Sequence, residues 1–344
     1  MNRGAPILVA FAAAALFGAA TPASKLLLAE LPPFQLAGLL YLGAALATLP
    51  WVVGDRRGRL GRLDRANRRR LLGAVALGGL VAPVLLLTGL RTTSAASVSL
   101  LLNLEMAATA VLGALLFHEP IGRLGWVSVS GIVAAGAVLS GGDWPGVAAA
   151  LLVAAACLCW GLDNHLTALI DGITPAVSTF CKGAVAGSVN LAIGVAVAPL
   201  TAAPGQIAAA LVVGAFAYGV SIALYIRAAQ QLGAVRAQAV FASAPFVGAA
   251  LAFGFLDEPL EPRIVIATVL LLGSAALLFR GVHGHAHRHA AVAHLHSHRH
   301  DDDHHLHEHA TVPAAARHSH THRHDELVHA HPHWPDLHHR HEHE

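Results

Sequence analysis

The stretch at residues 116–121 reads Leu-Phe-His-Glu-Pro-Ile, and it ends a long apolar segment of the chain. About 140 residues later, residues 255–260 read Phe-Leu-Asp-Glu-Pro-Leu and end a second such segment. The match extends backwards without gaps through sequence that is rich in Ala, Gly and Leu. Phe17-Gly18 and Trp160-Gly161 form a second matching pair nearer the start of each copy. These matches predict an internal repeat of about 140 residues.

Composition divides the 344-residue chain into two unlike parts. Hydrophobic residues make up 55% of the chain and charged residues only 12%, against about 25% charged in soluble domains. Of the 25 His, 23 lie after residue 281. We therefore predict an apolar body over 1–280 and a polar tail over 281–344. The length alone would allow two soluble domains, but this distribution excludes them.

The body contains apolar segments that are each long enough to span a membrane as a helix, which takes about 20 residues. They are too long and too uniformly apolar for strands, and they are rich in the small residues that let helices pack closely in lipid. The sequence predicts an all-α polytopic membrane protein with a first five-helix repeat over 1–141 and a second over 142–280. The ten expected spans are 6–28, 34–53, 71–90, 94–117, 124–141, 146–168, 176–198, 207–226, 235–256 and 263–280.

Eight Arg lie between Asp55 and Arg70, in the loop that joins the second and third expected spans. Loops rich in Lys and Arg stay on the cytoplasmic side, which places the N-terminus and, after ten spans, the C-terminus in the cytoplasm. Because five is an odd number, the second repeat is expected to be inverted relative to the first. Inverted repeats are typical of transporters that expose a central site to each side in turn. The abundance of Arg, Ala and Gly suggests a GC-rich bacterium, and therefore its inner membrane.

With these features the chain resembles the EamA-like branch of the drug/metabolite transporter superfamily. The resemblance rests on the two five-span copies, on the aromatic-Gly pairs that start them, and on the endings Glu119-Pro120 and Glu258-Pro259. It covers about 6–280. It implies secondary transport of a small solute by alternating access, often export, with both termini inside the cell. It does not define the substrate.

Polar and ionisable side chains inside the spans are costly in a bilayer, so each is a candidate for the transport site. Lys182 lies early in the second span of its copy, where family members often carry an Arg. The first copy departs from that pattern and has Leu39-Leu40-Tyr41 there. Tyr218, Tyr225, Asn190 and Gln238 are also polar residues within the spans. The predicted transport and coupling residues are Glu105, Asn103, Lys25, Asp163, Asn164, His165 and Lys182.

Glu105 is the strongest candidate, because it lies deepest in its span and no residue of its own helix neutralises it. Burial favours the neutral form of a carboxyl group, which suits reversible binding of a proton or a cation. The alternative is a structural ion pair with Lys25 or Lys182. Asp163 and His165 are two positions apart and do not share a helix face, so these two alone are not expected to bind a metal. An ion pair of Asp163 with Lys182 is an equal alternative, and polar packing is favoured for His165.

No catalytic constellation accompanies these residues. Inverted topology places Glu119 and Glu258 on opposite sides of the membrane, so we interpret them as helix ends, stopped by the following Pro and capped locally. A nucleophile elbow, a phosphate-binding loop and an HExxH motif are all missing from the sequence. We therefore predict no enzyme activity and no cofactor for transport. The formal charge of +2 gives no indication of a nucleic-acid partner.

The tail alternates His with other residues in several runs, a composition that is expected to be disordered and cannot form a packed core. Neutral imidazole binds zinc, nickel, cobalt and copper, so the tail is predicted to bind such a metal. The predicted ligands are His296, His298, His300, His305, His307, His309, His320, His322, His324, His329, His331, His333, His339 and His341.

Three functions follow from this combination of body and tail. The first is transport of a small solute, with metal binding by the cytoplasmic tail. The second is transport of divalent nickel, cobalt or zinc that the tail supplies or regulates, and the third is a membrane-anchored metal buffer or sensor. The predicted partners are the lipid bilayer and a small-molecule or metal-ion substrate. The sequence leaves the direction of transport, the coupling ion and the oligomeric state open.

Overall fold

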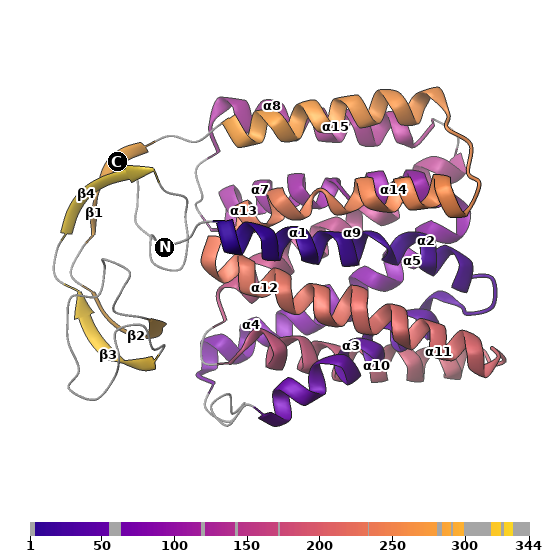
Figure 1. The fold of residues 1–344 in the computed structure, drawn as a ribbon, viewed down its shortest axis with the longest axis horizontal. Helices are drawn as coiled ribbons and strands as arrows, with labels where there is room; N and C mark the ends of the chain where they lie inside the picture. The colour runs from indigo at the N-terminus through magenta and orange to yellow at the C-terminus, as the bar shows by residue number, and fades with distance from the viewer. Residues whose placement is uncertain are drawn as a thin grey trace.

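The computed structural model describes residues 4–54, 63–117, 121–141, 144–170, 173–232 and 234–280 of the body, and 284–289, 292–298, 318–324 and 327–332 of the tail. In the body, all described regular structure is helical, and the helices run along the long axis of a bundle (Figure 1). The first repeat consists of α1 (Gly4–Gly18), α2 (Ala20–Leu27), α3 (Pro33–Gly54), α4 (Arg65–Ala74), the π-helix η2 (Val75–Val81), α5 (Ala82–Thr92), α6 (Ala95–Leu101), α7 (Leu104–Leu116) and α8 (Arg123–Leu139).

The second repeat has the same order of elements, except that the single helix α9 takes the place of α1 and α2. It consists of α9 (Trp144–Ala168), α10 (Pro175–Val197), α11 (Pro204–Val213), the π-helix η3 (Gly214–Val220), α12 (Ser221–Leu232), α13 (Ala234–Phe241), α14 (Ala244–Phe255) and α15 (Pro262–Arg280). Each π-helix lies between two α-helices of the third segment of its repeat, and the two lie about 140 residues apart. The fourth segment is broken in both copies, between α6 and α7 and between α13 and α14. The internal repeat that the sequence predicts is therefore confirmed.

Equivalent helices of the two repeats run in opposite directions. In Figure 1, α1 starts at the end of the bundle where α4 starts. Arg70 of α4 donates a hydrogen bond of 2.9 Å to the carbonyl oxygen of Leu169, just after α9. α9 therefore ends where its counterpart α1 begins, as an inverted repeat requires.

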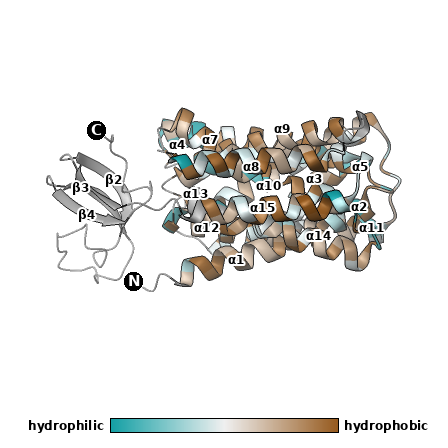
Figure 2. Cartoon of the chain, turned by 90° about the horizontal axis from the view of Figure 1, so that it is seen from above, coloured by the Kyte–Doolittle hydropathy of each residue, from teal (hydrophilic) through white to brown (hydrophobic). Residues whose placement is uncertain are grey.

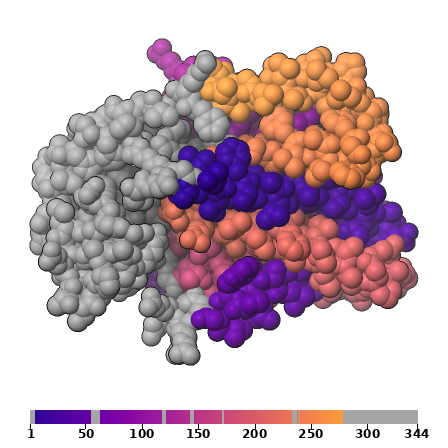
Figure 3. Space-filling model, in the orientation of Figure 1, coloured from indigo at the N-terminus to yellow at the C-terminus, as the bar shows by residue number. Residues whose placement is uncertain are grey.

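The two repeats interleave and do not form separate bodies. α3 packs on α10, α8 packs on α15, α1 lies against α12 and α14, and α9 lies against α5 and α7. On the face shown in Figure 3, bands from the second repeat (orange and pink) alternate with bands from the first (indigo and purple). Any cavity at the centre is therefore lined by both repeats.

Glycines bring α3 and α10 into close contact. A Cβ atom added to Gly38 would lie 2.5 Å from the backbone nitrogen of Leu191, and one added to Gly187 would lie 2.7 Å from the backbone nitrogen of Leu42. Larger residues would separate the helices, since such contacts are shorter than any Cβ tolerates. Close approach through small residues is typical of helices that pack in lipid.

The outer surface of the bundle is apolar. Leu8 and Phe255 are 70% and 79% exposed, and hydrophobic residues (brown in Figure 2) extend along most of the length of the helices. Among the described residues, seven segments are long and apolar enough to cross a membrane. They are Ala5–Leu27, Pro33–Gly54, Arg65–Thr92, Ala95–Leu116, Gly146–Ala168, Pro175–Val197 and Pro204–Leu232. Arg123–Leu139, Ala244–Phe255 and Pro262–Leu277 are shorter apolar helices. The expected total of ten spans stays a prediction.

The described part of the tail contains four short strands. β1 (Gly284–His289) pairs antiparallel with β4 (Leu327–Pro332), and β2 (Val292–His298) pairs antiparallel with β3 (His318–His324). A pair of two strands is only marginally stable alone in water. These two pairs therefore neither confirm nor contradict the expectation of a disordered tail without a packed core. Outside the described residues lie 55–62 of the Arg-rich loop, Glu119-Pro120, and the predicted ligands His300, His305, His307, His309, His333, His339 and His341.

Candidate functional site

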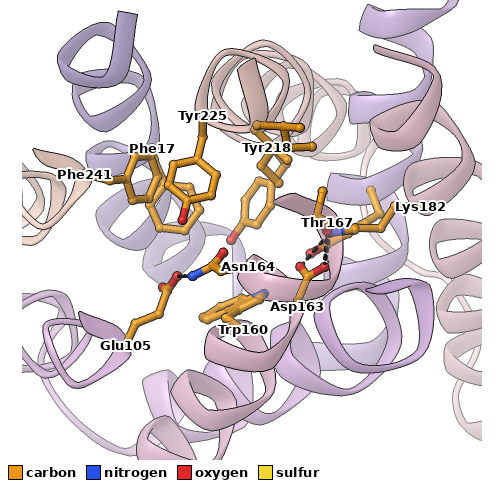
Figure 4. Close-up of a pocket in the computed structure, with 13 residues that line it drawn as sticks. Phe17, Glu105, Trp160, Asp163, Asn164, Thr167, Lys182, Tyr218, Tyr225 and Phe241 are labelled. Atoms are coloured by element: carbon orange, nitrogen blue, oxygen red, sulfur yellow. Dashed lines mark hydrogen bonds and ion pairs between the residues drawn. The ribbon is translucent and has the colours of Figure 1, made fainter. Parts of the chain in front are cut away.

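A cavity of about 40 Å³ lies between the two repeats, which is room for about three water molecules. Polar groups and aromatic rings share its wall, as the close-up in Figure 4 shows. The lining residues come from α1, α3, α7, α9, α10, η3, α12 and α13, and are Phe17, Tyr41, Glu105, Trp160, Asp163, Asn164, Thr167, Lys182, Tyr218, Ile222, Tyr225, Ile226 and Phe241. Four of the predicted site residues, Glu105, Asp163, Asn164 and Lys182, are brought together here.

Glu105 reaches the cavity from the start of α7, directly after the break in the fourth segment. Its side chain is buried, and Oε1 accepts a hydrogen bond of 2.9 Å from Nδ2 of Asn164. The same amide nitrogen lies 3.2 Å from Oγ1 of Thr109 and 3.3 Å from Oε1 of Gln238, whose side chain is also within hydrogen-bonding reach of Glu105. Among the described residues, no Lys, Arg or His forms an ion pair with this carboxyl group. Glu105 is therefore held by neutral amides.

Asp163 and Lys182 form a buried ion pair on the other side of the cavity. Nζ of Lys182 lies 2.7 Å from Oδ1 and 2.5 Å from Oδ2 of Asp163, and the two side chains are only 4% and 8% exposed. Thr167, one turn further along α9, donates a hydrogen bond of 2.8 Å to Oδ1. Of the two alternatives for Asp163, the structure forms the ion pair. The charge of Lys182 is thus already compensated, and the ion pair of Lys182 with Glu105 does not form.

The π-helix η2 contacts this ion pair through Gly78. Its carbonyl oxygen accepts hydrogen bonds from the hydroxyl of Tyr41 at 2.5 Å and from Nε1 of Trp160 at 3.0 Å. A Cβ atom at position 78 would lie 2.0 Å from Oδ2 of Asp163, so only glycine fits. π-Helical turns occur frequently at functional sites, and this one positions two side chains of the cavity wall.

A continuous cluster of aromatic rings surrounds the polar groups. Phe17 is at its centre, with ring centroids 5.2 Å from Phe241, 5.6 Å from Tyr218 and 6.4 Å from Trp160. The ring of Tyr225 packs against that of Phe241 in a tilted arrangement, with centroids 4.9 Å apart. The hydroxyl oxygen of Tyr225 is buried and has no hydrogen-bond partner among the described residues, and the close-up shows it on the side of the ring that faces Asn164 (Figure 4). The wall therefore offers one unused polar group.

Three predicted site residues lie elsewhere. Nζ of Lys25 donates to the carbonyl oxygens of Leu90 at 2.8 Å and Thr93 at 2.7 Å, at the end of α5. Asn103 donates back to the carbonyl oxygen of Leu100, 3.0 Å away, inside the break before α7. His165 shares a hydrogen bond of 2.9 Å with the carbonyl oxygen of Thr109, and its ring stacks on Phe117 with centroids 4.5 Å apart. The contacts of Lys25 and His165 join distant helices, the contact of Asn103 stays within its own segment, and none of the three residues lines the cavity.

Glu258 has a longer-range role than the local cap that the sequence predicts. Its two carboxylate oxygens accept hydrogen bonds of 2.7 and 2.8 Å from the backbone nitrogens of Ala95 and Ala96. These are the first two residues of α6, in the other repeat. A carboxylate is favoured at a helix N-terminus because the free N–H groups and the helix dipole both attract it. Glu258 therefore joins the two repeats, and the interpretation as a local cap is wrong.

Comparison with known proteins identifies the architecture. The EamA-like transporter family matches residues 4–141 and again 147–280, which is nearly the whole body. The chain belongs to the EamA-like transporter family. Its membership, together with the apolar helices, makes it a multi-pass membrane protein of a transporter family.

Individual relatives of this EamA-like protein carry no description of a substrate. An uncharacterized transporter of Methanothermobacter thermautotrophicus is 30% identical over 63% of this chain and 66% of its own length. An uncharacterized protein of Pseudomonas aeruginosa is 32% identical over 64% of this chain and 68% of its own length. The chain thus spans about two thirds of the length of both. One protein with a crystal structure superposes with a TM-score of 0.62 over 79% of this chain and 95% of its own, at 15% identity, which shows the shared fold.

Several residues of the EamA-like cavity wall were not selected from the sequence. In the sequence, Trp160 and Phe17 mark only the correspondence between the two copies, yet both side chains line the cavity. Their position in the repeat was a usable signal, since the equivalent residues of inverted copies meet where the copies face each other. Gln238 and Thr109 complete the surroundings of Asn164, and for these two the sequence offers no signal beyond their polarity.

Proposed function

We propose that this protein is a secondary transporter that moves a small solute by alternating access through the cavity between its repeats, with Glu105 as the group that binds the coupling proton. Interleaved, oppositely oriented repeats around a polar cavity support alternating access, because they allow one half to rock against the other around a fixed site. Export is the direction that the family resemblance favours. The cytoplasmic side would be the side of the Arg-rich loop, in a bacterial inner membrane.

The observation that carries the proposal is the state of Glu105. Its carboxyl group is buried between repeats, and its hydrogen-bond partners Asn164 and Gln238 are neutral. The charges of Asp163 and Lys182 compensate each other nearby. A buried carboxyl group that lacks a fixed counter-ion favours its protonated form, so its protonation can change when the solute arrives or leaves, whereas a fixed counter-ion would hold the group ionised.

The test compares the media of cells that express the wild-type protein, Glu105→Gln or Glu30→Gln. Glu30 is an exposed residue and provides the same chemical change away from the cavity. Untargeted mass spectrometry is expected to find at least one solute that accumulates outside cells with wild-type protein and Glu30→Gln and not with Glu105→Gln. Everted vesicles then report whether uptake of that solute follows an imposed pH gradient. Equal accumulation by Glu105→Gln, with unchanged pH dependence, contradicts the coupling role.

For the tail we propose binding of zinc, nickel, cobalt or copper. The register of β2 and β3 supports it, because His294, His296 and His298 lie opposite His322, His320 and His318. Directly opposite residues of an antiparallel pair are neighbours along the backbone, and His is a suitable ligand type for these metals. The same register supports a second candidate function, transport of a divalent metal that the tail supplies or regulates. A metal buffer or sensor would need only the tail.

Deletion of residues 281–344 separates these functions. Metal transport is expected to change cellular tolerance to nickel, cobalt or zinc on expression of the full chain, and deletion should reduce that change. Solute transport with a metal-binding tail leaves metal tolerance unaffected while equilibrium dialysis of the full chain still detects bound metal. Absence of bound metal in dialysis, measured at pH 7.5 with each ion separately, refutes the proposal for the tail.

A further inference from the structure

We propose that the cavity selects a small monovalent organic cation, a protonated amine or a quaternary ammonium ion, which exchanges one for one with the proton on Glu105. This inference rests on the proposed function and adds the chemical class of its substrate. It is carried by the charges of the cavity wall and by the aromatic rings around them.

The ionisable groups of the wall favour a cation. Three of the lining residues belong to the charged types Asp, Glu, Lys and Arg, namely Glu105, Asp163 and Lys182. Lys182 is bonded by both oxygens of Asp163, so an anionic or zwitterionic solute finds no unused cation here for its carboxylate. With Glu105 ionised, the wall carries one uncompensated negative charge. Because an uncompensated buried charge is costly, a monovalent cation or a proton is the expected companion of Glu105.

The aromatic rings distinguish an organic cation from a metal ion. Phe17, Trp160, Tyr218, Tyr225 and Phe241 line one cavity and contact one another. Ring faces attract alkylammonium groups and bury their methyl groups, and this attraction is stronger when water is excluded. Metal ions instead need several oxygen, nitrogen or sulfur ligands. Within the described residues, no group of three His, Cys, Asp or Glu is close enough to hold a metal ion.

The unpartnered hydroxyl of Tyr225 points to a ligand. Buried hydroxyl groups are normally hydrogen-bonded, and this one, on a side chain only 6% exposed, lacks a partner in the described chain. Together with Glu105 it supplies two oxygen acceptors to an ammonium N–H group or to polarised methyl groups. The room of about 40 Å³ suits a cation of a few heavy atoms.

Competition with the proton follows from the surroundings of Glu105. The groups that act on it electrostatically or by hydrogen bonding are few and come from α3, α9, α10, α12 and α13. They are Tyr41, Cys157, Asp163, Asn164, Lys182, Tyr225 and Gln238, with His165 bonded to the neighbouring backbone at Thr109. Since Asp163 and Lys182 offset each other, Glu105 is the group whose charge changes. When the cation binds, it displaces the proton from protonated Glu105, and the carboxylate that forms pairs with the cation, so one positive charge replaces another and charge and protons balance.

Direct binding tests this in the purified full chain in lipid nanodiscs, by isothermal titration calorimetry. The probes are methylammonium, tetramethylammonium and choline, and 3,3-dimethylbutan-1-ol, which has the shape of choline without its charge. At pH 8 at least one cation is expected to bind, and choline should bind about tenfold or more tighter than the alcohol. At pH 5.5 cation affinity should fall while that of the alcohol does not. Glu105→Gln should remove the preference for charge, and Glu30→Gln should keep it.

A second variant tests the rings. Phe17→Leu keeps an apolar side chain and removes the ring face, so it should weaken cation binding by about two- to thirtyfold and leave the alcohol unaffected. If none of the three cations binds to wild-type protein, or if choline and the alcohol both bind and do so with equal affinity, the cation proposal is overturned. The proposed function survives that result when Glu105→Gln has abolished export of some other solute, so the two failures are distinguishable.

Discussion

Replacing Lys182 by Met leaves the carboxylate of Asp163 buried without its cation. In the structure the ammonium nitrogen contacts both carboxylate oxygens, at 2.5 and 2.7 Å, and both residues are more than nine-tenths buried. Removal of one partner of such a pair costs about 3–5 kcal/mol, because the remaining charge keeps its desolvation penalty. The free energy of unfolding of Lys182→Met should therefore be lower than that of the wild type by about this amount.

The chain offers a matched control on its surface. Nε of Arg263 lies 2.6 Å from Oε2 of Glu261, a similar distance, but these side chains are 36% and 42% exposed. Exposed pairs contribute about 0–1 kcal/mol, so Arg263→Met should cost much less than Lys182→Met. The double variant Asp163→Asn/Lys182→Met removes both charges and keeps an acceptor for Thr167. Its stability should recover by about 2 kcal/mol or more relative to Lys182→Met, since neutral replacement of a buried pair is nearly without cost.

Reversible unfolding in mixed micelles with increasing SDS, or steric trapping in bicelles, measures these four free energies. Equal losses for Lys182→Met and Arg263→Met would show that burial does not determine the cost. A double variant as unstable as Lys182→Met would show that the lost stability comes from packing of the Lys side chain and not from the unpaired charge. Either result would refute the electrostatic reasoning for the cavity, including the compensation that leaves Glu105 without a counter-ion.

Three further changes, the first with a control substitution, have expected outcomes in the same unfolding assay. Gly78→Ala should be strongly destabilising, because its Cβ would lie 2.0 Å from Oδ2 of Asp163. Gly254→Ala is the control: among the described residues no atom lies within 4 Å of the added Cβ, so this substitution should be neutral or stabilising by up to about 1 kcal/mol. Glu258→Gln should cost about 1–2 kcal/mol, since it removes the charge from two hydrogen bonds at a helix N-terminus. Tyr225→Phe removes a hydroxyl that has no partner in the described chain and should leave stability unchanged or slightly higher; a loss above about 1 kcal/mol would reveal a missed contact.

Hydropathy and the repeat predict the helices of the body closely. The second and seventh expected spans, 34–53 and 176–198, correspond to Pro33–Gly54 and Pro175–Val197. Both start at a Pro, which suits the first turn of a helix because its missing N–H group is not needed there. Length, apolar content and helix-start residues are local properties, and local sequence therefore carries them.

Contacts across the repeats could not be predicted in this way. The partners of Glu105 and Asn164 come from segments 55 to 74 residues away in sequence, and Glu258 bonds backbone groups 162 and 163 residues away. Lys25 satisfies backbone carbonyl oxygens and not a carboxylate. The two π-helices add a wider turn without changing the hydropathy of their segments. These contacts depend on which helices become neighbours in the folded bundle, and a single sequence does not show that arrangement.

The fold is symmetric, but its polar groups are not. Glu105 is the second residue of α7, and the second residue of α14 is Pro245; three residues after Trp160 comes Asp163, but three residues after Phe17 comes Ala20. An inverted repeat lets the inward and outward states use equivalent contacts, so their free energies can lie close together. If both copies carried the charged residues, the site would contain two of each charge. One copy supplies the carboxyl group of Glu105 and the other the ion pair of Asp163 with Lys182. Under the proposed function, a single proton or cation would then be enough to change the balance between two states that the scaffold itself hardly distinguishes.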